Sequence, residues 1–128
     1  MIAEKKILLV DDIVEYLNTM ELNLPDGCQA FRATSLEESR NLISKEQPAV
    51  AIVDIRLDET DFKNRDGLEL LKWVNKNYPR TTVIMISAYR EFEFEAESLA
   101  LGAENFLKKP IQPDEFRKAV AQVLEQNP

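Results

Sequence analysis

The sequence predicts a doubly wound α/β sandwich, in which helices cover both faces of a parallel sheet. Short apolar runs alternate with longer segments of helical period along all 128 residues. Three of these runs, Ile7–Val10, Val50–Val53 and Val83–Ile86, contain no polar residue, as expected for parallel strands that are buried on both sides. The length suits one domain over residues 1–128, with residues 126–128 as a place where a linker could start.

The first half of the chain contains three of the five strands that we predict. Ile7–Val10 is the first strand, and Gln29–Ala33, which is less apolar, is the second. The segment between them is predicted as a helix, because apolar residues recur there on one helical face. These residues are Ile13, Leu17, Met20 and Leu24. Ser35–Glu38 has the spacing of a capping box, so a second helix starts there and leads to the strand Val50–Val53.

The second half repeats the alternation of helix and strand. Asp66 can cap a helix that begins at Gly67, and Val83–Ile86 is the fourth strand. A fourth helix is predicted to include Glu91–Leu99 and to end at Gly102. The stripe predicted to face the core is Phe92, Ala96, Leu99 and Ala103.

A weaker strand and a helix complete the chain. The strand is Asn105–Leu107, and Pro113 fits the first turn of the helix that follows. The apolar face of this last helix is Phe116, Val120, Val123 and Leu124. Strand and helix thus alternate throughout, which implies right-handed crossovers. Sheets of this kind bind ligands at the carboxyl ends of their strands, so the functional site is expected there.

Composition removes several classes of function. The chain has no histidine, which excludes Ser-His-Asp triads, Cys-His pairs and His-ligated zinc, and its one cysteine, Cys28, excludes an intrachain disulfide. A reducing, cytoplasmic location is expected. No apolar run reaches the ~18 residues of a membrane span. The net charge of −7, with a pI of about 4.7 and no basic cluster, disfavours nucleic acid as a direct partner. Proteins or cations are the expected partners.

Polar side chains gather where the predicted strands end. Asp11 and Asp12 follow the first strand, Asp54 the third, Ser87 the fourth and Lys109 the fifth. Alone, the acidic pair could simply cap the first helix. Three converging carboxylates would repel one another unless a cation lay among them, and oxygen ligands suit Mg²⁺ or Mn²⁺. With the cation and the lysine the site would be neutral and could receive an anion, for which a phosphoryl group is the natural candidate.

The order and spacing of four short motifs resemble the receiver domain of two-component response regulators. The motifs are Leu9–Asp12, Val53–Ile55, Ile86–Ala88 and Lys109–Pro110. The resemblance covers essentially the whole chain. It implies a flavodoxin-like (βα)5 sandwich with the strand order 2-1-3-4-5, and a cis peptide bond before Pro110.

The resemblance also assigns roles in a metal site. Asp54 is the implied phosphoacceptor, Asp12 would ligate Mg²⁺ directly, and Asp11 would help to hold the ion, partly through water. The backbone carbonyl of Arg56 would complete the protein ligands. Since the chain has no histidine, the phosphoryl group must come from a partner: a sensor histidine kinase, a phosphotransfer protein or a small acyl phosphate.

A switch is implied by the same motifs. Ser87 and Lys109 would bind the phosphoryl group on Asp54, and Phe106, which stands where the family often has tyrosine, would turn inward as Ser87 moves. The face made by helix 4, strand 5 and helix 5 would then change its affinity for an output domain or protein, or for a second copy of the chain. The chain would not be an enzyme beyond its own phosphorylation and dephosphorylation.

Two alternatives are weighed against this interpretation. A pseudo-receiver would keep the fold without phosphorylation, but the complete acidic set and Lys109 argue against it. An aspartyl-phosphate phosphatase of the haloacid dehalogenase type would need a D-x-D motif after the first strand, whereas Asp11 is followed by Asp12 and Ile13.

Two further features are particular to this chain. The segment Ile55–Arg65 is longer than the usual loop of the family, and its charged part, Asp58–Arg65, is either a tolerated insertion or an element that screens water or selects the kinase. In the fourth helix, Phe94, Ser98 and Leu101 lie on a side other than the predicted core stripe. Phe94 is therefore either a docking residue on the output face or a side chain folded over the core edge. Trp73 and Cys28 are interpreted as packing residues.

Overall fold

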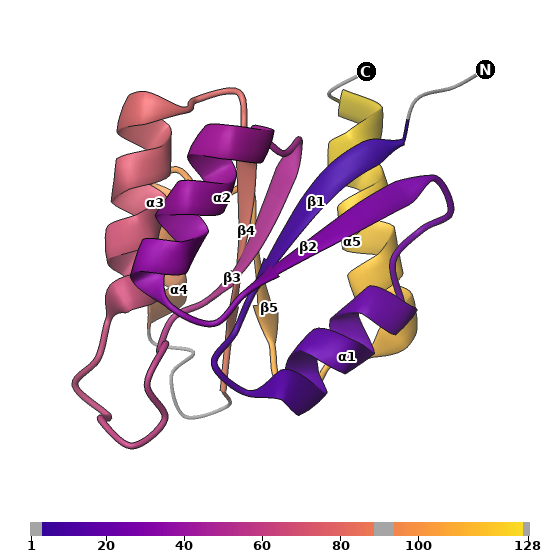
Figure 1. The fold of residues 1–128 in the computed structure, drawn as a ribbon. Helices are drawn as coiled ribbons and strands as arrows, with labels where there is room; N and C mark the ends of the chain where they lie inside the picture. The colour runs from indigo at the N-terminus through magenta and orange to yellow at the C-terminus, as the bar shows by residue number, and fades with distance from the viewer. Residues whose placement is uncertain (1–3, 89–93, 127–128) are drawn as a thin grey trace.

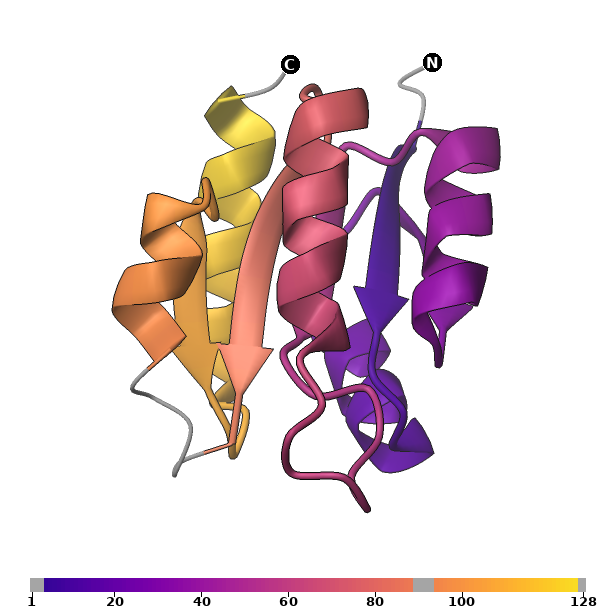
Figure 2. The same ribbon diagram turned by 90° about the vertical axis from the view of Figure 1, so that its left-hand side faces the viewer.

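Five parallel strands form the middle layer of the structure, a computed structural model that describes residues 4–88 and 94–126. Helices α1 and α5 cover one face of the sheet, and α2, α3 and α4 cover the other (Figures 1 and 2). The elements are β1 (Lys5–Val10), α1 (Val14–Leu22), β2 (Cys28–Ala33), α2 (Leu36–Glu46), β3 (Val50–Asp54), α3 (Asp66–Asn77), β4 (Thr82–Ser87), α4 (Glu95–Ala100), β5 (Asn105–Lys108) and α5 (Pro113–Gln126). The predicted fold class is confirmed.

The strand order is β2-β1-β3-β4-β5, as predicted. Every pairing is parallel, so all the carboxyl ends lie at one edge of the sheet (Figure 2). Val10 of β1 pairs with Val53 of β3. The residues that follow them, Asp11 and Asp54, therefore leave the sheet side by side. This register brings together two acidic residues that are far apart in the sequence.

Alternating side chains of the central strands fill two apolar clusters, one on each face. Leu8 and Val53 belong to the cluster under α2, α3 and α4, whereas Ile7 and Ile52 belong to the cluster under α1 and α5. All five residues of β3 are buried. Each large apolar side chain in these clusters contributes about 1.5–3 kcal/mol to folding, which fixes the register and with it the position of the strand ends. Within residues 4–88 and 94–126, no helix has the length and apolar character needed to cross a bilayer.

Helix boundaries follow the predicted signals with one exception. Ser35 Oγ accepts a hydrogen bond from the Glu38 backbone N–H at 3.1 Å, so the predicted cap of α2 is confirmed. Gly102, at φ +104°, follows the end of α4, and Pro113 opens α5. The prediction that Asp66 caps a helix beginning at Gly67 is wrong, because α3 begins at Asp66 itself.

The predicted core-facing stripe is wrong within α4, although its last member, Ala103, which follows the helix, is buried as predicted. Its described members in the helix, Ala96 and Leu99, are exposed, and the start of the helix at Glu91 and the side chain of Phe92 lie outside the described residues. Ser98 is fully buried instead, and Phe94 and Leu101 pack against the core cluster under α2, α3 and α4. Among the described residues, the inward face is therefore the one that carries Phe94, Ser98 and Leu101.

This orientation leaves the hydroxyl of Ser98 buried without a hydrogen-bond partner among the described residues. A buried hydroxyl without a partner costs about 1–3 kcal/mol, so Ser98→Ala is expected to stabilise the protein by about 1 kcal/mol in urea unfolding. Ser39 is the matched control, because it is equally buried but its Oγ donates to Ser35 O at 2.7 Å. Ser39→Ala should destabilise the protein. Equal losses for both variants would contradict the orientation of α4.

Candidate functional site

Three carboxylates meet at the carboxyl edge of the sheet. Asp11, Asp12 and Asp54 each offer an oxygen atom, and these atoms all lie within 4.8 Å of one another. Asp11 and Asp54 are buried, with exposed fractions of 0% and 1%. The convergence predicted from the strand ends is therefore present in the structure.

A lysine reaches the same place from the end of β5. The Nζ atom of Lys109 lies 2.8 Å from Asp11 Oδ2 and 3.2 Å from Asp54 Oδ2. Lys109 is 5% exposed, whereas Lys108 is exposed to solvent. The two lysines are therefore distinct in environment, as the alternation of β5 predicts. The bond between Lys109 and Pro110 is cis, as the resemblance implied.

The pKa values of Asp11, Asp54 and Lys109 are shifted by burial and by their mutual interactions. Burial, followed by the negative charge of Asp11, raises the pKa of Asp54 to about 8, although Lys109 opposes the rise. Burial also raises the pKa of Asp11. For Lys109, burial alone would lower the pKa of the ammonium group, but the charges of Asp54 and Asp11 outweigh it and the net direction is upward. One lysine thus does not compensate three carboxylates, and the site favours an additional cation.

The donor set fits a hard divalent cation. Asp12 Oδ1 is buried and has no hydrogen-bond partner among the described residues. A carboxylate oxygen in that position has lost its hydrogen bonds to water, and no protein donor among the described residues replaces them, which is energetically unfavourable. Three carboxylates around one point supply the oxygen ligands that Mg²⁺ or Mn²⁺ prefers, so the residues present fit such an ion.

The remaining predicted site residues lie around this cluster. Ser87 ends β4, is fully buried, and its Oγ donates to the Ala88 carbonyl at 3.3 Å. Arg56, two residues after Asp54, is buried. Phe106 points inward with an exposed fraction of 7% and belongs to the core cluster under α2, α3 and α4.

The loop between β3 and α3 contacts the acidic cluster directly. The backbone N–H of Glu59 donates to Asp12 Oδ2 at 2.8 Å. At the other end of the loop, the guanidinium of Arg65 lies 4.8 Å from the centre of the Phe94 ring. Because Phe94 is half-buried, packs on the core and is covered by Arg65, the structure favours the core-edge alternative for this side chain.

Several residues of the site were not identified from the sequence. Lys109 Nζ lies 3.9 Å from the centre of the Tyr16 ring, which is a cation–π contact. Gly67 lies against the backbone of Asp54 and Ile55 with no room for a side chain. An aromatic residue one helical turn after the acidic pair was an available signal for Tyr16; the Glu59 contact uses a backbone N–H and leaves no signal in the sequence.

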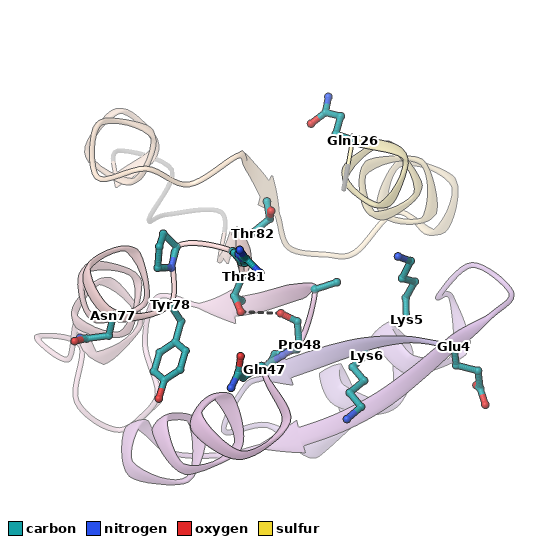
Figure 3. A pocket seen from close by; sticks show the side chains of 13 residues that line it. Glu4, Lys5, Lys6, Gln47, Pro48, Asn77, Tyr78, Thr81, Thr82 and Gln126 are labelled. Atoms are coloured by element: carbon teal, nitrogen blue, oxygen red, sulfur yellow. Dashed lines mark hydrogen bonds between the residues drawn. The ribbon is translucent and has the colours of Figure 1, made fainter. Parts of the chain in front are cut away.

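A broad hollow lies at the other end of the sheet from the acidic cluster. It has a volume of about 1030 Å³ and lies between the amino ends of the strands and the end of α5, with Lys5, Lys6, Tyr78 and Gln126 among its lining residues (Figure 3). Within this lining the Thr81 hydroxyl donates to the Pro48 carbonyl at 2.7 Å (Figure 3). The acidic cluster is therefore separate from this hollow.

Comparisons with known proteins point to one family. The family model of the response regulator receiver domain matches residues 7–121. Sporulation initiation phosphotransferase F of Bacillus subtilis is 33% identical over 123 residues, which are 94% of each chain. Response regulator protein PilR of Pseudomonas aeruginosa is 30% identical over 95% of this chain, but the match spans only 26% of PilR.

Solved structures show the same fold. A CheY-like response regulator receiver domain protein from Methanospirillum hungatei superposes with a TM-score of 0.85 at 28% identity, covering 98% of this chain and 97% of that one. The receiver domain of NtrX from Brucella abortus superposes with a TM-score of 0.84 at 30% identity, covering 93% and 98%. The chain therefore belongs to the response regulator receiver domain family.

Proposed function

We propose that this receiver domain is a phosphorylation switch that accepts a phosphoryl group on Asp54 from a phosphohistidine of a partner protein. The observation that carries the proposal is the position of Asp54: a buried carboxylate at a strand end, 3.2 Å from the Lys109 amine and beside two further carboxylates. A small acyl phosphate would serve as an alternative donor.

The transfer forms a bond between a carboxylate oxygen of Asp54 and phosphorus. The phosphorus–nitrogen bond of the donor breaks, and the imidazole nitrogen leaves with the electron pair of that bond. Asp11, Asp12, Asp54 and the carbonyl of Arg56 would hold Mg²⁺, or Mn²⁺, which when bound neutralises charge on the phosphoryl oxygens. Lys109 balances the same charge from the other side, and its contacts with Asp11 and Asp54 keep its amine at the site.

The signal would leave the site through Ser87 and Phe106. The hydroxyl of Ser87 would turn from the Ala88 carbonyl to the phosphoryl group, and Phe106, which has no hydroxyl, would respond only through packing. The face formed by α4, β5 and α5 would then bind an output domain, a separate protein or a second copy of the chain.

The setting of the switch follows from these roles. A sensor histidine kinase or a phosphotransfer protein in the cytoplasm would supply the phosphoryl group. Residues 1–128 would act as one receiver unit, without direct contact to nucleic acid or membrane, and without turnover of a separate substrate. PilR extends well beyond the matched region, which is consistent with output functions located outside receiver domains.

Intact-mass measurement after incubation with a small acyl phosphate and Mg²⁺ tests the proposal. The wild type should gain the mass of one phosphoryl group, and the gain should disappear with a chelator. Asp54→Asn should gain nothing, because the amide cannot attack phosphorus. Asp26→Asn is the matched control, since Asp26 is exposed in the turn before β2, at the other end of the sheet, and it should be labelled like the wild type. A folded wild-type protein that is never labelled would favour the pseudo-receiver instead.

A further inference from the structure

The loop between β3 and α3 is built into the acidic site. We propose that the Glu59 backbone N–H orients the carboxylate of Asp12 so that its Oδ1 atom faces the cation, which makes the Asp58–Arg65 loop part of the metal site. The inference rests on the proposed function, because it concerns the ion that the phosphorylation switch would use.

The two oxygen atoms of Asp12 have different environments. Oδ2 accepts the hydrogen bond from the Glu59 N–H at 2.8 Å, between residues 47 positions apart. Oδ1 is buried, has no hydrogen-bond partner among the described residues, and belongs to the residue set that converges with Asp11 and Asp54. A carboxylate held at one oxygen cannot rotate freely, so the Glu59 contact keeps the other oxygen turned into the cluster.

The loop carries its own framework for holding Glu59 in place. Asp58 Oδ1 accepts hydrogen bonds from the Thr60 N–H at 3.0 Å and from its hydroxyl at 2.6 Å. The Asp61 N–H donates to the Asp58 carbonyl at 3.1 Å. These bonds close a turn around Glu59, and its N–H points out of the turn toward Asp12.

A second set of hydrogen bonds ties the loop to its two ends. Asn64 Oδ1 accepts from the Leu57 N–H and from the Asp66 N–H, each at 3.0 Å. Asn64 Nδ2 also donates to Asp66 Oδ2 at 3.1 Å. The side chain of Asn64 thus joins the residues that enter and leave the loop, and this limits the positions that the turn at Glu59 can take.

Outer groups that orient metal ligands matter for affinity: their removal typically weakens metal binding about 10- to 100-fold. An alternative is that Asp12 merely anchors the loop, in which case the loop would depend on Asp12 but the cation would not depend on the loop. The two cases differ in one measurable quantity, the affinity of the unphosphorylated protein for Mg²⁺.

A pair of substitutions at one position separates these cases. Glu59→Pro removes the N–H itself, and Glu59→Ala removes the side chain but keeps the N–H. In calorimetric titrations of the full chain with MgCl2 and no phosphoryl donor, we expect Glu59→Pro to bind Mg²⁺ about tenfold more weakly than Glu59→Ala. Equal affinities of the two variants would overturn the proposal.

Asn64→Ala provides an independent test if the proline disturbs folding. It leaves Glu59 intact but removes the acceptor that joins Leu57 and Asp66, so it should also weaken Mg²⁺ binding. Lys63→Ala, an exposed change in the same loop, should leave the affinity unchanged. Unchanged binding in Asn64→Ala would count against the role of the loop, whereas a wild type that binds Mg²⁺ and is labelled on Asp54 would keep the proposed function. Absence of Mg²⁺ binding by the wild type would overturn both.

Discussion

Gly67→Ala is expected to destabilise the protein by about 3 kcal/mol, a large loss for a substitution that adds one methyl group. A Cβ atom at this position would lie 2.7 Å from Ile55 Cα and closer still to the carbonyl oxygen of Asp54. Both neighbours are backbone atoms at the end of a fully buried strand, so neither can move without displacing β3. The Gly67 N–H also donates to the Ile55 carbonyl at 2.8 Å, which holds α3 against this strand.

The substitution should also affect the functional site, because the added Cβ atom would displace the backbone of Asp54. Urea unfolding gives the free energy of unfolding, and Mg²⁺ titration of the protein that remains folded should show weaker binding. Gly27→Ala is the control: Gly27 has φ +82° but no atom within 4 Å of an added Cβ, so only backbone strain of about 1 kcal/mol is expected. Similar losses for the two variants would show that α3 does not pack against β3 as closely as described.

The strands and the acidic cluster were predictable because each rests on a strong local pattern. Runs such as Val50–Val53 are apolar without interruption, since β3 is buried on both faces. Asp11 and Asp54 follow the runs that pair in register, so their convergence follows once the two strands are neighbours. That neighbour relation came from the resemblance to the receiver family, because short apolar runs do not specify which strands pair.

The predictions that failed concern elements whose geometry depends on few residues. Helix α4 has only six residues, so either of two stripes satisfied the helical period, and the packing of Phe94 against the core decided between them. Asp66 has the chemistry of a cap, but its side chain accepts a hydrogen bond from Asn64 instead. The contact of the Glu59 N–H with Asp12 could not be predicted from the sequence, since every residue except proline carries a backbone N–H.

Asp54→Asn is expected to make the metal-free protein more stable at about pH 8 by on the order of 2 kcal/mol. The pKa of Asp54 is raised from an ordinary value near 3.8 to about 8, chiefly by burial. Between these two values the folded wild type retains a proton that the unfolded chain releases. Its stability therefore falls as the pH rises through this window. Asparagine does not ionise, so the stability of the variant should not include this decrease as the pH rises.

Urea unfolding in the presence of a chelator, from about pH 5 to about pH 8, measures this difference. The advantage of Asp54→Asn over the wild type should grow steadily with pH. Asp58→Asn is a control with the opposite pH dependence. Hydrogen bonds from Thr60 lower the pKa of Asp58, so the contribution of the ionised Asp58 to stability is lost only as the pH falls.

Mg²⁺ should reverse the order of stability at high pH, because the cation binds the ionised form of Asp54 and replaces its proton. The affinity of the wild type for Mg²⁺ should accordingly rise between about pH 6 and about pH 8, and that of Asp54→Asn should be lower and less dependent on pH. A wild type whose metal-free stability and Mg²⁺ affinity are both independent of pH in this window would show that Asp54 is ionised without the metal. Lys109 alone would then compensate the buried carboxylates, and the cation would be dispensable for holding Asp54 in its reactive form.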